Sequence, residues 1–259
     1  MKKMNDRLYV STVADDDVIV AEKYGIGIEI AEFCTASNMD RDSSTYGIKA
    51  VPKIESTSKL IFHAPFNELC PAAIDPMIVD ITRRRYEQAF ELSLGYGINK
   101  IVVHSGYIPL IYHKSWFAER SVEFWREFLS SQPKELEIYL ENVMEDEPGL
   151  LRSIIEDVGD SRFKLCLDVG HANTLISDTP LTEWVDVCAP YLEHVHLHNN
   201  VGQMDLHSPV FDGSIDMYKV LTDIFEKAPD VTFTIESLHA GSSMEWLIRK
   251  VFFEYGQEI

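Results

Sequence analysis

Short apolar runs and longer amphipathic segments alternate along this chain. Eight of the runs have the length of buried strands. Most lack a strict apolar–polar alternation, which is typical of strands that are covered on both faces. We expect strands at Leu8–Val13, Gly27–Phe33, Leu60–Pro65, Lys100–His104, Glu137–Asn142, Lys164–Asp168, His194–His198 and Val231–Glu236.

Helical patterns separate these strands, with apolar residues three to four positions apart. Strand–helix alternation of this kind predicts parallel βα units. Eight strands in 259 residues predict an α/β fold, a single (β/α)8 TIM barrel over residues 1–259, close to the usual size of about 250 residues. We expect helices at Asp15–Tyr24, Ile78–Leu94, Ser115–Leu129, Pro148–Asp157, Thr182–Ala189, Ile215–Phe225 and Ser243–Tyr255.

One unit departs from the pattern. Between Cys34 and Lys59 we find no clear amphipathic helix, only a polar stretch and a break at Pro52. Long loops inside compact domains are usually functional. This one follows a barrel strand, so we interpret it either as a lid over the active face or as a surface excursion with a short, irregular helix.

Six of the predicted strands end at a residue that can bind a metal. The C-terminal ends of all strands of a parallel barrel lie on one face, so these six side chains are expected to converge there. Burying them together without a cation would leave charges unpaired, at a large desolvation cost. The six are His63, His104, Glu141, Asp168, His196 and Glu236.

Three more residues extend this set to nine. His171 follows Asp168 after Gly170, which would permit a tight turn at the end of the strand. Asp205 and His207 lie two positions apart in a polar loop and so face the same side. Nine ligands exceed the four to six that one transition-metal ion takes. We therefore expect a divalent metal cofactor, Zn or Mn, with one to three ions per chain, and any spare groups free for acid–base work.

Composition narrows the class of partner. The net charge of −19, from 23 basic and 42 acidic residues, argues against nucleic acid, whose binding depends on Lys and Arg. No apolar run reaches the ~20 residues of a membrane span, and no signal-type stretch follows Met1–Arg7, so we expect a cytoplasmic protein that does not enter the membrane. The apolar stretch Tyr107–Phe117 is expected either to wall the pocket or to cover a subunit contact, which leaves a homo-oligomer open.

The strand-end motifs resemble those of the xylose isomerase-like barrel superfamily, which includes sugar isomerases and epimerases and the apurinic endonuclease IV family. The resemblance runs from about Leu60 to Glu236. The motifs that carry it are Phe62-His63-Ala64-Pro65-Phe66, Val103-His104-Ser105-Gly106, Leu140-Glu141-Asn142, Leu167-Asp168-Val169-Gly170-His171, Val195-His196-Leu197-His198-Asn199, Asp205-Leu206-His207 and Ile235-Glu236.

Two branches of this superfamily imply different sites. Similarity to endonuclease IV implies that all nine residues bind three zinc ions. Similarity to the ketose epimerases implies one metal bound by four of them, Glu141, Asp168, His196 and Glu236, with the two glutamates as the proton-transfer pair. The epimerases usually have an arginine in the loop after strand seven, whereas Asp205-Leu206-His207 stands there in this chain.

We therefore predict a divalent-metal-dependent isomerase or epimerase of a small sugar or sugar-phosphate, in which Glu141 and Glu236 are catalytic. We expect His198, Asn142 and Asn199, which lie at strand ends, to bind substrate, although a supporting role is open for His198. The alternative is a multinuclear zinc phosphoester hydrolase that resembles endonuclease IV. Two further hypotheses for the function are a lyase that acts on a cyclic hydroxy-ketone and a non-catalytic scaffold with a structural metal.

Overall fold

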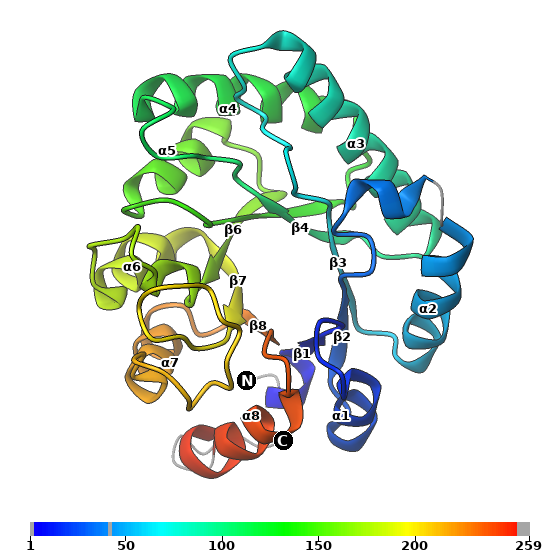
Figure 1. Cartoon of the computed structure of the whole chain (residues 1–259), viewed down its shortest axis with the longest axis vertical. Helices are drawn as coiled ribbons and strands as arrows, with labels where there is room; N and C mark the ends of the chain where they lie inside the picture. Colours follow the sequence, from blue (N-terminus) through cyan, green and yellow to red (C-terminus); the bar gives the residue numbers. More distant parts are fainter. Residues whose placement is uncertain (1–2, 41–42, 253–259) are drawn as a thin grey trace.

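The eight predicted strands form a closed parallel barrel in the order β1 to β8. The barrel is closed by the pairing of β1 with β8. A computed structural model describes residues 3–40 and 43–252. In Figure 1 the strands occupy the centre and the helices form a ring around them. The strands are β1 (Leu8–Ser11), β2 (Gly27–Ile30), β3 (Leu60–His63), β4 (Lys100–His104), β5 (Glu137–Glu141), β6 (Phe163–Asp168), β7 (Leu192–Leu197) and β8 (Thr232–Ile235).

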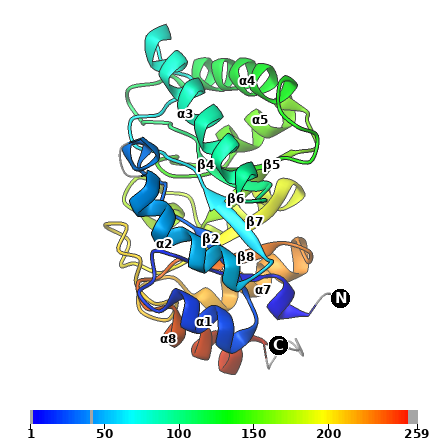
Figure 2. The same ribbon diagram turned by 90° about the vertical axis from the view of Figure 1, so that its right-hand side faces the viewer.

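A helix follows each strand, so the fold is the predicted TIM barrel. Helices α3 and α4 cover one side of the barrel, and α1 and α8 cover the opposite side (Figure 2). The predicted last helix extends to Tyr255, and the end of that prediction lies outside the described residues. The helices are α1 (Asp17–Tyr24), α2 (Ser43–Ser56), α3 (Pro76–Gly95), α4 (Lys114–Ser130), α5 (Gly149–Val158), α6 (Leu181–Cys188), α7 (Met217–Lys227) and α8 (Ala240–Leu247), which continues into a π-helical turn at Ile248–Phe252.

The segment after β2, expected either to form a lid or to be a surface excursion with a short, irregular helix, contains a helix of 14 residues. Helix α2 spans Ser43–Ser56 with Pro52 inside it, and its buried Ala50 belongs to the main core. Pro52 has no N–H to donate and interrupts the helical pattern in the sequence, which is why a helix of this length was not expected. No described residue between Thr35 and Lys59 lines the central cavity. The segment therefore belongs to the outer helical ring.

Side chains that point into the barrel become more polar toward the C-terminal ends of the strands. Successive interior side chains are two residues apart on a strand. On β5 buried Tyr139 is followed by Glu141, and on β7 His194 is followed by His196. The metal-ligand candidates therefore lie above an apolar interior layer, which consists of Tyr9, Ile61, Val102, Tyr139 and Cys166.

Among the described residues, no helix combines the length and the hydrophobicity that crossing a bilayer requires.

Candidate metal centre

The nine predicted ligands lie at the C-terminal ends of β3 to β8 and in the loops that follow β6 and β7, and the structure brings them together. Glu141 lies at the middle of the group. One of its carboxylate oxygens is 3.4 Å from Nε2 of His63 and 3.2 Å from Nε2 of His104. The other is 3.3 Å from Nδ1 of His196 and 3.4 Å from Nδ1 of His171.

Three of the imidazoles are held with one nitrogen facing the group. His63, His171 and His207 each donate Nδ1–H to a backbone carbonyl, of Ala64 at 3.0 Å, Asn142 at 2.8 Å and Glu236 at 2.8 Å. A carbonyl only accepts, so these hydrogen bonds keep a proton on each Nδ1 and make Nε2 the potential ligand atom. Such backbone contacts are a common way of orienting metal-binding histidines.

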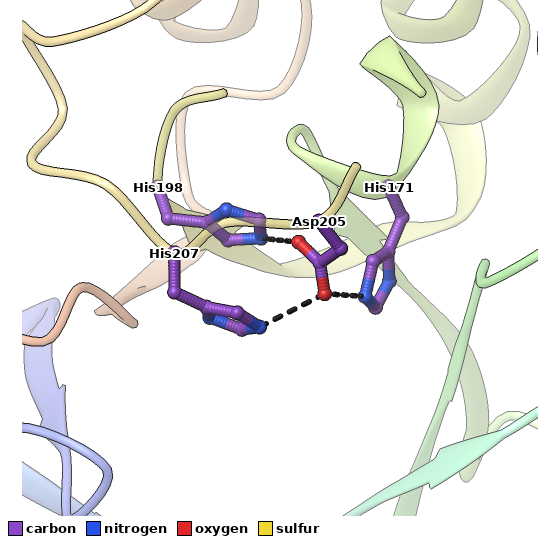
Figure 3. Close-up of side chains that lie close together, drawn as sticks. All are labelled: His171, His198, Asp205 and His207. Carbon is purple, nitrogen blue, oxygen red and sulfur yellow. Dashed lines mark hydrogen bonds and ion pairs between the residues drawn. The ribbon is translucent and has the colours of Figure 1, made fainter. Parts of the chain in front are cut away.

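Two groups of residues with no member in common could each hold an ion. In the first, ligand atoms of Glu141, Asp168, His196 and Glu236 all lie within 4.8 Å of one another. The second consists of His171, His198, Asp205 and His207 and meets the same limit. In this second group the Asp205 carboxylate lies between three imidazole rings (Figure 3), 3.1 Å from Nε2 of His171 and 2.9 Å from Nε2 of His207.

The first group has the chemistry of a cation site. All four side chains are buried, yet Oε2 of Glu141, Oε2 of Glu236 and Nδ1 of His196 have no hydrogen-bond partner. Buried polar atoms are normally paired. Carboxylate and imidazole donors without thiolate suit Zn²⁺ or Mn²⁺. The residues present therefore fit a divalent metal, which would satisfy these atoms and offset the clustered negative charge.

Without a cation, the histidines and carboxylates of the centre stabilise one another's charges. Burial opposes the charge on Glu141, but the imidazoles of His104 and His196 outweigh it and hold its pKa well below the ordinary value. Burial likewise opposes a charge on His171, but Asp168 and Asp205 raise its pKa well above the usual range. Asp205 is the main group that raises the pKa of His207, to about 9, against the opposing effect of burial.

The three residues predicted to bind substrate are held by other protein groups. Asn142 exchanges two hydrogen bonds with the backbone of Asp168, at 2.9 and 2.8 Å. The Asn199 amide donates to the carbonyls of Val210 and Ile215. Nε2 of His198 lies 2.9 Å from the Asp168 carboxylate, which it orients. All three are buried and none lines the cavity, so their assignment to substrate binding remains a prediction that the geometry does not favour.

Sequence reasoning missed Glu29. This fully buried residue lies in the middle of β2, where its Oε1 is 3.2 Å from Nε2 of His196. Its Oε2 accepts a hydrogen bond of 2.6 Å from Thr234 and lies 3.3 Å from Nε2 of His194. His196 therefore presents Nδ1 to the ligand group and Nε2 to Glu29. An acidic residue between two isoleucines of a buried strand was the available signal.

A cavity of about 540 Å³ opens above the centre. Seven of the nine candidates line it, whereas Asp168 and His196 lie deeper. Ligand pockets of small-molecule enzymes have volumes of roughly 300–1,000 Å³, so the cavity can admit a small substrate beside the candidate ions. The seven are His63, His104, Glu141, His171, Asp205, His207 and Glu236.

Comparison with known proteins agrees with this architecture. The model of one protein family, described as xylose isomerase-like TIM barrel, matches residues 24–250. An uncharacterized protein of Methanocaldococcus jannaschii is 27% identical over 188 residues, which are 69% of this chain. The match spans 64% of the length of that relative.

Solved structures share the fold over nearly the whole chain. A D-tagatose 3-epimerase-like protein has a TM-score of 0.75 at 24% identity, covering 96% of this chain and 97% of that one. A protein of Thermus thermophilus, from crystals soaked with zinc chloride, has a TM-score of 0.71 at 22% identity, covering 95% and 97%. D-psicose 3-epimerase of Clostridium cellulolyticum, in a structure with D-tagatose, scores 0.66 at 17% identity, covering 98% and 100%.

Proposed function

Because this chain belongs to the xylose isomerase-like TIM barrel family, we propose that it is a divalent-metal-dependent isomerase or epimerase of a small sugar or related hydroxy-carbonyl compound. Structural neighbours of the chain include a D-psicose 3-epimerase and a D-allulose 3-epimerase. Identities below a quarter establish the fold alone, so the proposal rests on the geometry of the centre and on the family together.

The observation that carries the proposal is the position of two glutamates. Oε1 of Glu141 and Oε2 of Glu236 lie 3.3 and 3.0 Å from the same atom, Nδ1 of His196. They come from β5 and from the end of β8, and both line the cavity. Two carboxylates that approach one point from different strands can face a substrate carbon from two directions.

In this proposal, some residues of the chain bind the metal and two of them also transfer protons. Glu141, Asp168, His196 and Glu236 would hold the metal. The bound cation supplies a Lewis acid that withdraws electrons from a carbonyl group and makes the adjacent C–H bond more acidic. One glutamate removes that proton and the other returns a proton to the carbon, on the same or the opposite face. The low pKa of Glu141 keeps this carboxylate ionised, as a general base must be, although it also makes the carboxylate a weaker base.

Solvent deuterium exchange tests the proposal. The metal-loaded protein is incubated in D₂O with a panel of ketoses, aldoses, their phosphates and related hydroxy-ketones, and NMR follows loss of the carbon-bound proton. We expect exchange with at least one compound, and a loss of about 10²-fold or more in Glu236→Gln. Glu226→Gln, on the exposed face of α7, is the matched control. If no compound of the panel exchanges a carbon-bound proton, the proposal is wrong.

A second candidate, a zinc phosphoester hydrolase, is favoured by the second ligand group. With His171, Asp205 and His207 the candidate ligands number nine, more than the four to six that a single ion takes. Two or three neighbouring metal ions suit the activation of water and the stabilisation of a leaving oxygen. Cleavage of an abasic duplex or of a small phosphodiester by the zinc-loaded protein would support this candidate. The net charge of −19 disfavours the DNA-directed form.

A further inference from the structure

The cavity above the metal centre has two unlike sides. Its floor and one side consist of the ligand candidates, including those from the loops after β6 and β7. The opposite wall comes from the loops after β3, β4 and β5 and from the first turn of α3, and it is mostly apolar, with Asn67, Glu68 and Tyr107 as its polar members. Its principal side chains are Phe66, Leu69, Ile78, Ile108, Tyr112 and Met144.

Contacts between aromatic rings hold side chains of the apolar wall in position. The ring of Phe66 stacks on His104 at 4.2 Å with an interplanar angle of 12°, so the wall begins directly at the metal centre. Tyr112 stacks on Trp116 at 6.0 Å and 6°. Further along, Ile108 and Met144 are 45% and 40% exposed, so they present apolar surface that a ligand can cover.

Among the described residues, the wall offers no cationic side chain to an anionic group, and few polar groups beside the Asn67 amide and the hydroxyls of Tyr107 and Tyr112. Within the described part of the chain, the cavity lining contains no Lys or Arg, and Glu68 adds negative charge there. The Tyr112 hydroxyl lies 3.6 Å from the Cys70 thiol, which donates to it. A phosphate placed at this end would meet no cationic partner, although a phosphate at the floor could still contact the metal.

We propose that the substrate has a polar head that binds the metal through neighbouring carbonyl and hydroxyl oxygens, and an uncharged apolar ring or chain that lies against Phe66, Ile108 and Met144. This inference rests on the proposed metal-dependent function and narrows its substrate class. It directs the search toward cyclic or aryl-substituted hydroxy-carbonyl compounds and away from substrates with a terminal phosphate.

Three hydroxamates that share one chelating head test this inference. Acetohydroxamic acid carries a methyl group, benzohydroxamic acid a phenyl ring, and 4-carboxybenzohydroxamic acid a charged ring. Their affinities for the zinc-loaded protein are measured by calorimetry. We expect the phenyl compound to bind at least tenfold more tightly than the methyl compound, about 1.4 kcal/mol. The carboxylate should cancel most of that gain.

Wall variants show whether the apolar side chains are responsible. Ile108→Ser and Met144→Ser should each reduce the phenyl-to-methyl affinity ratio to about threefold or less. Ile111→Ser is the matched control, because Ile111 is exposed in the same loop and does not line the cavity; it should leave the ratio unchanged.

The outcomes separate the two proposals. Equal binding of the phenyl and methyl compounds, or a phenyl preference that the wall variants leave intact, overturns the substrate class while the metal centre stands. If neither compound binds and elemental analysis finds no metal, the proposed function and this inference fall together. Deuterium exchange confined to unsubstituted sugars and their phosphates would overturn this inference and support the proposed function.

Discussion

The Glu29 carboxylate lies 3.2 Å from Nε2 of His196, on the opposite edge of the imidazole from Nδ1, which faces the ligand group. A carboxylate in this position fixes the orientation of a metal-binding histidine and raises its basicity. Both residues are fully buried. We therefore expect Glu29 to act as a positioning residue for His196, although with His63 and His196 it also forms a third group of possible ligands.

Replacing Glu29 by Gln should weaken binding of the metal by about 10- to 100-fold, the range that such supporting contacts usually contribute. The amide keeps the size of the side chain but loses its charge. Competition with a chromophoric chelator measures the affinity, and the visible spectrum of the cobalt form reports the geometry. Glu137→Gln, near the start of β5 and away from the centre, is the control. An unchanged affinity and spectrum would assign Glu29 a purely structural role.

Asp205→Asn should abolish ion binding at the group that contains Asp205 and leave ion binding at the group of Glu141 intact. The carboxylate of Asp205 joins His171 and His207 but does not belong to the group of Glu141. We expect wild-type protein to hold more than one ion per chain by elemental analysis, and this variant to hold about one fewer. If the isomerase proposal is right, the variant keeps proton exchange within about tenfold. Asp212→Asn, exposed in the same loop, is the control, and a single ion in every form would contradict the two-group geometry.

The stability of the metal-free protein should decrease with rising pH because of His207. Its pKa is raised to about 9 from an ordinary 6.5, so the folded state holds a proton that the unfolded state releases earlier. The resulting stabilisation is fully present below pH 6.5 and is lost as pH rises to 9, on the order of 3 kcal/mol. Urea unfolding of wild type and His207→Gln at pH 6 and pH 9 measures it. The difference between the two proteins should shrink at pH 9; a constant difference would rule the effect out.

Metal binding should show the opposite pH dependence. An ion that binds Nε2 of His207 must displace the proton that Asp205 favours there, so the affinity should rise as pH increases toward 9. Calorimetry in buffers of different ionisation enthalpy will count the protons released. We expect His207→Gln to release fewer protons per ion bound. Equal release from both proteins would mean that His207 is not a ligand.

Gly170→Ala should disturb the centre through His198. A Cβ at Gly170 would lie 1.9 Å from Cε1 of His198, the imidazole that orients the Asp168 carboxylate. Overpacking of this kind costs about 1–3 kcal/mol, so we expect lower stability and weaker metal binding. Gly95→Ala is the control, because its Cβ would meet nothing within 4 Å. Equal behaviour of the two variants would show that the His198 ring can move without consequence.

The sequence predicted the barrel and the convergence of nine side chains because both depend on simple periodicities. Strand ends mark one face of a parallel barrel, so His104 and Glu141 could be placed together without coordinates, and they lie at paired positions of β4 and β5. Helix α2 was missed because Pro52 interrupts its pattern.

Features that depend on contacts between strands were not visible. The partnership of Glu29 with His196 joins the middle of β2 to β7. Gly170 was expected to serve a tight turn, but its φ of −74° suits any residue, and the need for glycine comes from the His198 ring. In both cases the partner lies far away in the chain.

The closure of the barrel by β1 and β8 has a consequence for biosynthesis. Glu236 directly follows β8, the eighth strand of the barrel, and its carboxylate completes the group formed by Glu141, Asp168 and His196. A nascent chain that has released β7 can neither close the ring nor offer this full set of ligands. If this group binds an ion as proposed, capture of the ion requires a completed barrel, and a chain that retains the metal has closed its ring of strands.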